Sequence, residues 1–183
     1  MKERYGTLGE KRQALLEMSS AEYVSHWDDD DVYLPWFLEE QMGYLRSGHK
    51  FVKPVASMWF SGSSLRPPAR NIMEGSVSFC RKSALELGGY ENVQSGQCLR
   101  MLNAASSHGI YKHYDAYPVS GYIMCWSGTP RHVSTRKDFA SNNKDFGPVR
   151  IQDLSNIFRI IAEQSKSFLD KDRHSALLSR LSS

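Results

Sequence analysis

The sequence predicts an α/β protein in which helices flank a sheet. Segments of good helix formers alternate with short runs typical of strands. The chain has 183 residues and 40% hydrophobic residues, which is enough to bury one core. Four consecutive aspartates at 28–31 stand between a strand pattern and a proline-led helix, where open α/β sheets bind ligands. We therefore predict a single α/β domain over 1–183.

The chain begins with a predicted helix and a predicted strand. Residues 8–18, L-G-E-K-R-Q-A-L-L-E-M, are good helix formers. The expected inward stripe of this helix is Ala14, Leu15 and Met18. A short buried strand is expected over 22–27, and its apolar residues are Tyr23, Val24 and Trp27.

A second helix is predicted over 35–46, with Pro35 in its first turn and Gly48 marking its end. Its expected inward residues are Leu38, Met42 and Leu45. Residues 50–60 follow as one strand, with Pro54 at an edge or an end of it.

The remaining chain continues the alternation of helices and strands. We expect, in order, a loop at 61–70, a strand at 75–80, a helix at 83–87 capped by Ser83 and closed by Gly88 and Gly89, a helix at 97–105, and strands at 110–117 and 121–126. A polar segment at 135–148 leads to a helical tail at 150–183. Its core-facing stripe is Ile151, Leu154, Phe158, Ile161 and Phe168.

The four aspartates allow two interpretations. Adjacent carboxylates repel one another, so a folded chain keeps all of them ionised only in open water or around a cation. In the first interpretation the run is a solvated turn, with Asp31 capping the following helix. In the second it binds a divalent metal, which the aromatic and apolar residues on both sides of the run favour.

Composition excludes several classes of function. The three cysteines are odd in number and widely spaced, which predicts reduced thiols and neither a disulfide framework nor a zinc site. A net charge of +3 with scattered basic residues gives no reason to expect a nucleic-acid partner. The apolar runs are too short to span a bilayer and the N-terminus lacks a signal-peptide core, so the expected location is the cytoplasm.

Four blocks in the sequence resemble, in order, those of family 2 glycosyltransferases with the GT-A fold. The blocks are the K-R-Q helix, W-D-D-D-D-x-Y-x-P, E-G-S-V-S-F-C-R-K-S-A-L-E-L-G-G-Y, and S-G-Q-C-L-R-M-L. The similarity covers about residues 5–134. It implies a GT-A-like, Rossmann-like mixed sheet flanked by helices, and transfer of a sugar from a nucleotide-sugar donor to a saccharide or other hydroxyl acceptor.

The resemblance also implies a site. The implied ligands for Mn²⁺ or Mg²⁺ are Asp28, Asp30, Asp31 and His132. The implied donor-binding residues are Lys11, Arg12, Asp28 and Asp29. Gln13 replaces the asparagine usual in the family's block. For Lys11, Arg12 and His132, the alternative interpretation is an ordinary surface residue. The metal would neutralise charge that builds on the departing diphosphate.

Two departures from the family pattern bear on activity. Cys98 occupies the place of the carboxylate that deprotonates the acceptor hydroxyl, and an unperturbed thiol is a poor base at neutral pH. Glu91 and Asp115 are the nearest acids in sequence, so either is a candidate substitute. The general base is therefore left unassigned.

The second departure lies at the start of the chain. A complete family member opens with a strand, a helix and a strand that hold the nucleobase, whereas this chain begins at about the third unit. The expectation is a metal-dependent, inverting glycosyltransferase core that is N-terminally truncated and associates with itself or with a completing N-terminal chain. The alternative hypothesis is a non-catalytic remnant or split-enzyme half that binds metal or a partner chain.

Overall fold

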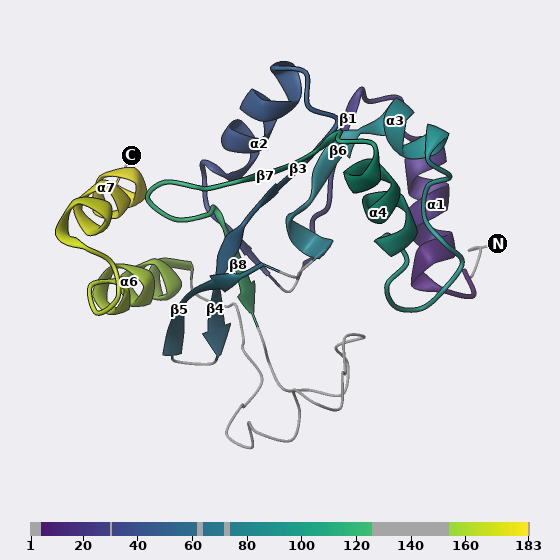
Figure 1. The fold of residues 1–183 in the computed structure, drawn as a ribbon. Coiled ribbons are helices and arrows are strands. Elements are labelled where there is room, and N and C mark those ends of the chain that lie inside the picture. Colours follow the sequence, from purple (N-terminus) through teal and green to yellow (C-terminus); the bar gives the residue numbers. More distant parts are fainter. Residues whose placement is uncertain (1–4, 30, 62–63, 72–73, 126–153, 183) are drawn as a thin grey trace. The chain divides into compact units, whose positions relative to one another are not determined.

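The chain folds into two compact units, each built on its own four-stranded sheet. The computed structural model describes residues 5–29, 31–61, 64–71, 74–125 and 154–182 (Figure 1). Unit 1 comprises Met1–His26, Gln41–Lys53 and Ser76–His113, and unit 2 comprises Trp27–Glu40, Pro54–Gly75 and Tyr114–Ser183. The protein is thus α/β with two mixed four-stranded sheets flanked by helices, where the sequence predicts one sheet. The predicted boundaries near 134 and 150 stay predictions, and the polar segment 135–148 lies outside the described residues.

The sheet of unit 1 has the strand order β1-β6-β3-β7. Its strands are β1 Tyr23–Ser25, β3 Phe51–Pro54, β6 Ser78–Cys80 and β7 Tyr111–Tyr114. Central strand β6 pairs antiparallel with both neighbours, so Phe79 lies opposite Val24 on one side and Phe51 on the other. Phe51 and Phe79 are fully buried and their rings stack 5.5 Å apart. These rings anchor the core of unit 1.

Three helices lie beside this sheet: α1 Leu8–Met18, α3 Arg81–Glu86 and α4 Leu99–Ser107 (Figure 1). The predicted inward stripe of α1 is wrong, because Leu15 and Met18 are 58% and 79% exposed whereas Leu16 is buried. The cause is a tertiary contact at the other end of the helix. Gly9 N–H donates to Val93 O at 3.1 Å. A Cβ on Gly9 would come within 1.8 Å of the Glu91 carbonyl oxygen, so only glycine allows this close approach. The contact fixes α1 with the face that carries Gly9 and Leu16 turned inward.

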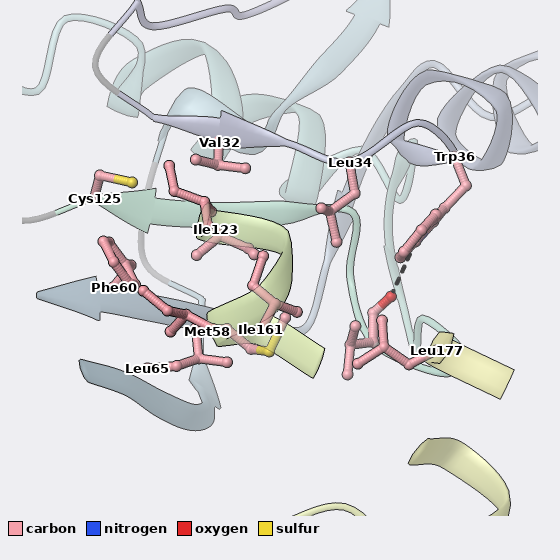
Figure 2. Packing of buried hydrophobic residues seen from close by; sticks show 13 residues of the cluster. Val32, Leu34, Trp36, Met58, Phe60, Leu65, Ile123, Cys125, Ile161 and Leu177 are labelled. Carbon is pink, nitrogen blue, oxygen red and sulfur yellow. Dashed lines mark hydrogen bonds between the residues drawn. The ribbon is translucent and has the colours of Figure 1, made fainter. Parts of the chain in front are cut away.

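The sheet of unit 2 has the strand order β2-β8-β4-β5. Its strands are β2 Val32–Tyr33, β4 Ala56–Ser61, β5 Ser64–Arg70 and β8 Tyr122–Cys125. Strands β4 and β8 run parallel while the outer pairs are antiparallel. Met58, Phe60 and Ile123 project from this sheet into an apolar cluster that Ile161 and Leu177 complete (Figure 2). This cluster is the core of unit 2.

The tail is helical as predicted, in two pieces, α6 Leu154–Ser165 and α7 Lys171–Leu181. The helices lie side by side (Figure 1), and α6 packs against β5. Ile161 of the predicted stripe is fully buried and Phe158 and Phe168 pack partly buried against the core, while Ile151 lies outside the described residues. Among the described residues, no helix is both long and apolar enough to cross a membrane.

Helix α2, Phe37–Arg46, begins two residues later than predicted, and Gly48 follows its end with the expected positive φ of 106°. Leu38 is 43% exposed, so the predicted stripe is wrong there. Leu45 is buried as predicted, and the helix also buries Phe37 and Gln41, which lie one turn apart. The Gln41 amide donates to Ser76 O at 2.8 Å, which compensates part of its burial.

The segment 50–70 differs from its prediction. The expected single strand is two strands in different sheets, and it is divided where β3 ends at Pro54. The expected loop at 61–70 contains strand β5. Its prolines, Pro67 and Pro68, are tolerated because β5 is an edge strand and because both fall between Arg66 and Ala69, where the register with β4 shifts. Composition alone therefore gave the wrong assignment for this segment.

The short helices and a short 3-10 turn complete the fold. The N-cap of α3 is Cys80, so the prediction that Ser83 caps this helix is wrong, whereas Gly88 and Gly89 close it with positive φ as expected. The predicted strand at 75–80 is η1 Glu74–Ser76 followed by β6. Trp27 is 57% exposed, which contradicts its predicted burial in the first strand.

Candidate functional site

The acidic run lies in the short connection between β1 and β2, and its first residue is held by a tyrosine of β2. The Asp28 N–H donates to the Tyr33 hydroxyl at 2.9 Å. That hydroxyl in turn donates to the Gly75 carbonyl oxygen, also at 2.9 Å. The Asp31 N–H donates to the Asp28 carbonyl oxygen at 3.4 Å and closes the turn. The backbone at both ends of the run is therefore fixed by hydrogen bonds within unit 2.

The carboxylate of Asp31 is bound to strand β8 and does not cap α2 as the solvated-turn interpretation expected. Its Oδ2 accepts a hydrogen bond of 2.6 Å from the Tyr122 hydroxyl. Its Oδ1 accepts one of 2.8 Å from the Cys125 N–H. Both oxygens thus bind one strand, at its first and last residues, so Asp31 has a fixed orientation.

Asp28 and Asp31 face the same point above the backbone of Gly75. A Cβ placed there would lie 2.6 Å from Asp28 Oδ2, 3.2 Å from Tyr122 Oη and 3.4 Å from Asp31 Oδ2. Because the Asp28 carboxylate already occupies this space, only glycine fits here without displacing it. We refer to this group, formed by Asp28, Asp31, Tyr122 and the backbone of Gly75, as the recess.

The electrostatics of this recess act on Tyr122. Burial raises the pKa of its phenol well above the usual value of 10, and the nearby Asp31 carboxylate raises it further. Tyr122 therefore stays protonated at neutral pH. It remains a hydrogen-bond donor to Asp31.

The structure brings some of the predicted metal ligands together. Asp28 and Asp31 share the recess, while Asp29 between them is exposed. Asp30 and His132 lie outside the described residues, so their predicted roles stay predictions. Within the described part of the chain, no group of three or more histidine, cysteine, aspartate or glutamate side chains has the spacing to hold a metal.

The predicted donor-binding cations lie in unit 1. Lys11 and Arg12 are on α1, where Lys11 is exposed and Arg12 is half-buried. Their neighbour Gln13 has a structural role, because its side-chain oxygen accepts a hydrogen bond of 2.8 Å from the Tyr90 N–H. The K-R-Q block is thus connected to the G-G-Y block in the same unit. The donor-binding role of the two cations stays a prediction.

The candidate bases differ in their surroundings. Cys98 is fully buried in the apolar core of unit 1. Glu91 lies 3.8 Å from Arg100, measured from Oε1 to Nε, and its side chain is 38% exposed. Asp115 is 83% exposed and lies 3.9 Å from Arg173 in unit 2. Burial of Cys98 favours a packing role for the thiol.

The sequence interpretation missed Tyr33, Gly75 and Tyr122, which complete the recess. The pairing of β2 with β8 places Tyr33 opposite Tyr122, and the turn at η1 brings in Gly75. Two of these residues had a signal in sequence, since Tyr33 is the Tyr of W-D-D-D-D-x-Y-x-P and Gly75 is the first Gly of the E-G-S-V-S-F block. Tyr122 is distant from both and belongs to none of the four blocks.

A scan of the chain against protein-family models gives no match. A search of curated proteins also finds no significant relative. The function is therefore argued from the recess and from the four sequence blocks alone.

Proposed function

We propose that the protein is a metal-dependent glycosyltransferase core of the GT-A type that transfers a sugar from a nucleotide-sugar donor to an acceptor hydroxyl with inversion. The observation that carries this proposal is the convergence of the Asp28 and Asp31 carboxylates above Gly75. The order of the four sequence blocks supports the choice of glycosyltransferase among metal-dependent enzymes. We further propose a cytoplasmic location and association of the chain into a homo-oligomer.

The residues of the recess fit a divalent cation such as Mn²⁺ or Mg²⁺. The available ligands are hard carboxylate oxygens, the type these ions prefer. Mg²⁺ is commonly held by one or two carboxylates together with substrate phosphates, and not by a complete protein cage. Asp28 and Asp31 would supply such a pair, with Asp30 and His132 as the further predicted ligands. When bound, the ion neutralises charge on the diphosphate leaving group.

The side chains of the recess have distinct proposed roles. Asp28 would supply one ligand oxygen, and its carboxylate is the one that lies closest to Gly75. Asp31 is oriented by the Tyr122 hydroxyl and the Cys125 N–H, so it needs no reorganisation when the donor arrives. Tyr122 stays neutral and keeps this orientation across the physiological pH range. An inverting transfer needs no enzyme nucleophile, since the acceptor hydroxyl attacks the anomeric carbon in line.

The test is a donor-hydrolysis screen on the full chain. UDP-, GDP- and dTDP-sugars are incubated with Mn²⁺, and released nucleoside diphosphate is measured for wild type, Asp28→Asn and Asp172→Asn. Asp172 is a matched control because it is an exposed carboxylate in the first turn of α7. We expect Mn²⁺-dependent release that falls at least about tenfold in Asp28→Asn only. Release that is unchanged in Asp28→Asn, or no release from any donor, would contradict the proposal.

The burial of Cys98 favours a second candidate, a chain that binds a metal or a partner chain without turnover. A fully buried thiol in an apolar core does not reach an acceptor hydroxyl. This candidate predicts Mn²⁺-dependent nucleotide binding with no hydrolysis or transfer. Detectable turnover that depends on Asp28 would exclude it.

A further inference from the structure

Strands β1, β3 and β7 of unit 1 run in the same direction. Both β1 and β3 are antiparallel to β6, so they are parallel to one another. Between β3 and β7, Phe51 N–H donates to Ile110 O at 3.1 Å and Val55 N–H donates to Tyr114 O at 2.8 Å. These bonds advance together along both strands, which therefore run parallel. The carboxyl ends of the three strands thus lie at one edge of the sheet, where open α/β sheets bind ligands.

A basic residue lies at each of these three ends. The registers of β6 with its two neighbours place Val77 between His26, directly after β1, and Lys53, near the end of β3. The His26 N–H donates to Val77 O at 2.9 Å, in agreement with this register. The parallel bonds of β3 and β7 place His113 beside Lys53. Because paired residues on adjacent strands share a face of the sheet, we call His26, Lys53 and His113 the basic row.

The basic row borders an apolar face of the sheet. The other side chains that the register places on this face, none of them charged, are Val24, Phe51, Val77, Phe79 and Tyr111. Lys53 is only 6% exposed, so its ammonium group attracts an anion more strongly than it would in water. His113 is exposed, so the basic row is open to solvent at this end.

The two histidines are held in place by neighbouring rings. His26 is buried, stacks on Tyr90 with ring centroids 5.5 Å apart, and its Nε2 is hydrogen-bonded to the Tyr90 hydroxyl. The His113 ring lies 4.4 Å from that of Tyr111. Adjacent strands are about 5 Å apart, so Lys53 lies about 5 Å from His113 and about 10 Å from His26 along the row. The spacing of the three basic groups is therefore set by the sheet.

We propose that the basic row binds the phosphate groups of a substrate without a metal ion. Lysine binds phosphate as a point charge, and imidazole N–H groups donate hydrogen bonds to phosphate oxygens. Phosphate groups joined in a chain present oxygens several ångströms apart, as the row requires, whereas the two oxygens of a carboxylate lie side by side. The phosphate belongs to the donor diphosphate or to a phosphorylated acceptor. This site goes beyond the proposed function, because it lies in unit 1 and contains no residue of the recess.

The test measures dissociation constants by calorimetry without divalent metal for pyrophosphate, UDP and glucose 1-phosphate. The variants are Lys53→Met and His113→Phe, which remove the basic groups but keep the length of one side chain and the ring of the other. Lys112→Met is the matched control, because Lys112 precedes His113 on β7 and lies on the opposite face of the sheet. We expect pyrophosphate to bind about tenfold or more weakly to both variants and equally well to the control.

The two sources of phosphate are distinguished by the other ligands. A loss of affinity shared by UDP supports the donor diphosphate, and a loss shared by glucose 1-phosphate supports a phosphorylated acceptor. Urea denaturation shows whether each variant is folded, and the exposed position of His113 makes His113→Phe the safer of the two.

Three results would overturn the inference. They are unchanged pyrophosphate affinity in a folded Lys53→Met or His113→Phe protein, an equal loss in Lys112→Met, and no binding of any of the three ligands by the folded wild-type protein. None of these results involves Mn²⁺ or Asp28. The inference and the proposed function are therefore tested separately, and either one can fail while the other stands.

Discussion

The Tyr122 hydroxyl donates a 2.6 Å hydrogen bond to Asp31 Oδ2, joining the first residue of β8 to the last of the four aspartates. The Cys125 N–H at the other end of the strand binds the second oxygen of the same carboxylate. An acidic residue that the sequence predicts as a metal ligand thus also fixes the connection between two strands of unit 2. Removing the Tyr122 hydroxyl therefore tests the structural role of Asp31 while its carboxylate, the proposed metal ligand, is kept.

The first prediction concerns this hydrogen bond. Tyr122→Phe keeps the ring but removes the donor to a charged group, so we expect a loss of about 1–2 kcal/mol in the free energy of unfolding. Urea denaturation of wild type and Tyr122→Phe measures this loss in the free energy of unfolding. Tyr117→Phe is the control, because the Tyr117 ring is 49% exposed and its cation–π contact with Arg173 is retained by phenylalanine. Equal stability of Tyr122→Phe and wild type would contradict the prediction.

The raised pKa of Tyr122 gives a second prediction, on pH dependence. Burial, and then Asp31, raise the pKa of this phenol well above 10 in the folded state, whereas in the unfolded chain it titrates near 10. The unfolded state therefore releases a proton first, and stability is lost as pH rises above about 10, by up to about 1.4 kcal/mol per pH unit. Urea denaturation between about pH 8 and about pH 11 is expected to show a shallower decline for Tyr122→Phe. Identical slopes would contradict this assignment.

The third prediction concerns Gly75. A Cβ at this position would lie 2.6 Å from Asp28 Oδ2, so Gly75→Ala must displace that carboxylate. We expect Mn²⁺-dependent nucleotide binding to weaken about tenfold or more, measured by calorimetry. Gly43→Ala is the control, because nothing lies within 4 Å of a Cβ there and alanine suits a helix. Equal nucleotide affinity of the Gly75→Ala and Gly43→Ala variants would contradict the prediction that the nucleotide binds at the recess.

The fourth prediction concerns the tail helix α7. Arg180 donates a 2.8 Å hydrogen bond to Glu40, whose side chain is only 17% exposed, and the Arg180 guanidinium lies 5.4 Å from the Trp36 ring centroid. Arg180→Ala leaves a largely buried carboxylate without this partner, so we expect a loss of about 2 kcal/mol by urea denaturation. Arg159→Ala breaks an exposed pair with Glu163 and is expected to change stability by less than about 0.5 kcal/mol. Similar losses in both variants would contradict this ranking.

Local sequence predicts the position of elements better than their orientation. The bounds of α1 were predictable because its residues are good helix formers, and the Thr7 side chain caps it by accepting the Glu10 N–H. The buried face of α1 was not predictable, because the contact of Gly9 with the 91–93 backbone decides which residues turn inward. Strand β5 was missed for a similar reason. Proline-rich composition predicts a loop, whereas the edge position of β5 and the shift in its register with β4 make a strand possible.

The candidate site was predictable only in part. The four aspartates identify the connection after β1, because a dense acidic run between apolar segments is visible in sequence. The positions of the residues around these aspartates were not predictable, because Tyr122 and Gly75 reach the run through strand pairing and a distant turn. Trp27 fitted an apolar strand pattern and was expected to be buried. Its exposure follows from the chain leaving the first sheet at Ser25, before the tryptophan.

The most direct test of the central claim is a calorimetric titration of UDP and GDP into the full chain, with and without Mn²⁺, repeated with Asp28→Asn. Asp172→Asn serves as the exposed-carboxylate control. The account predicts binding of at least one nucleotide that requires Mn²⁺, is unchanged in Asp172→Asn and is lost in Asp28→Asn. Binding that does not need the metal, binding that survives Asp28→Asn, or no binding by the folded wild-type protein would contradict it.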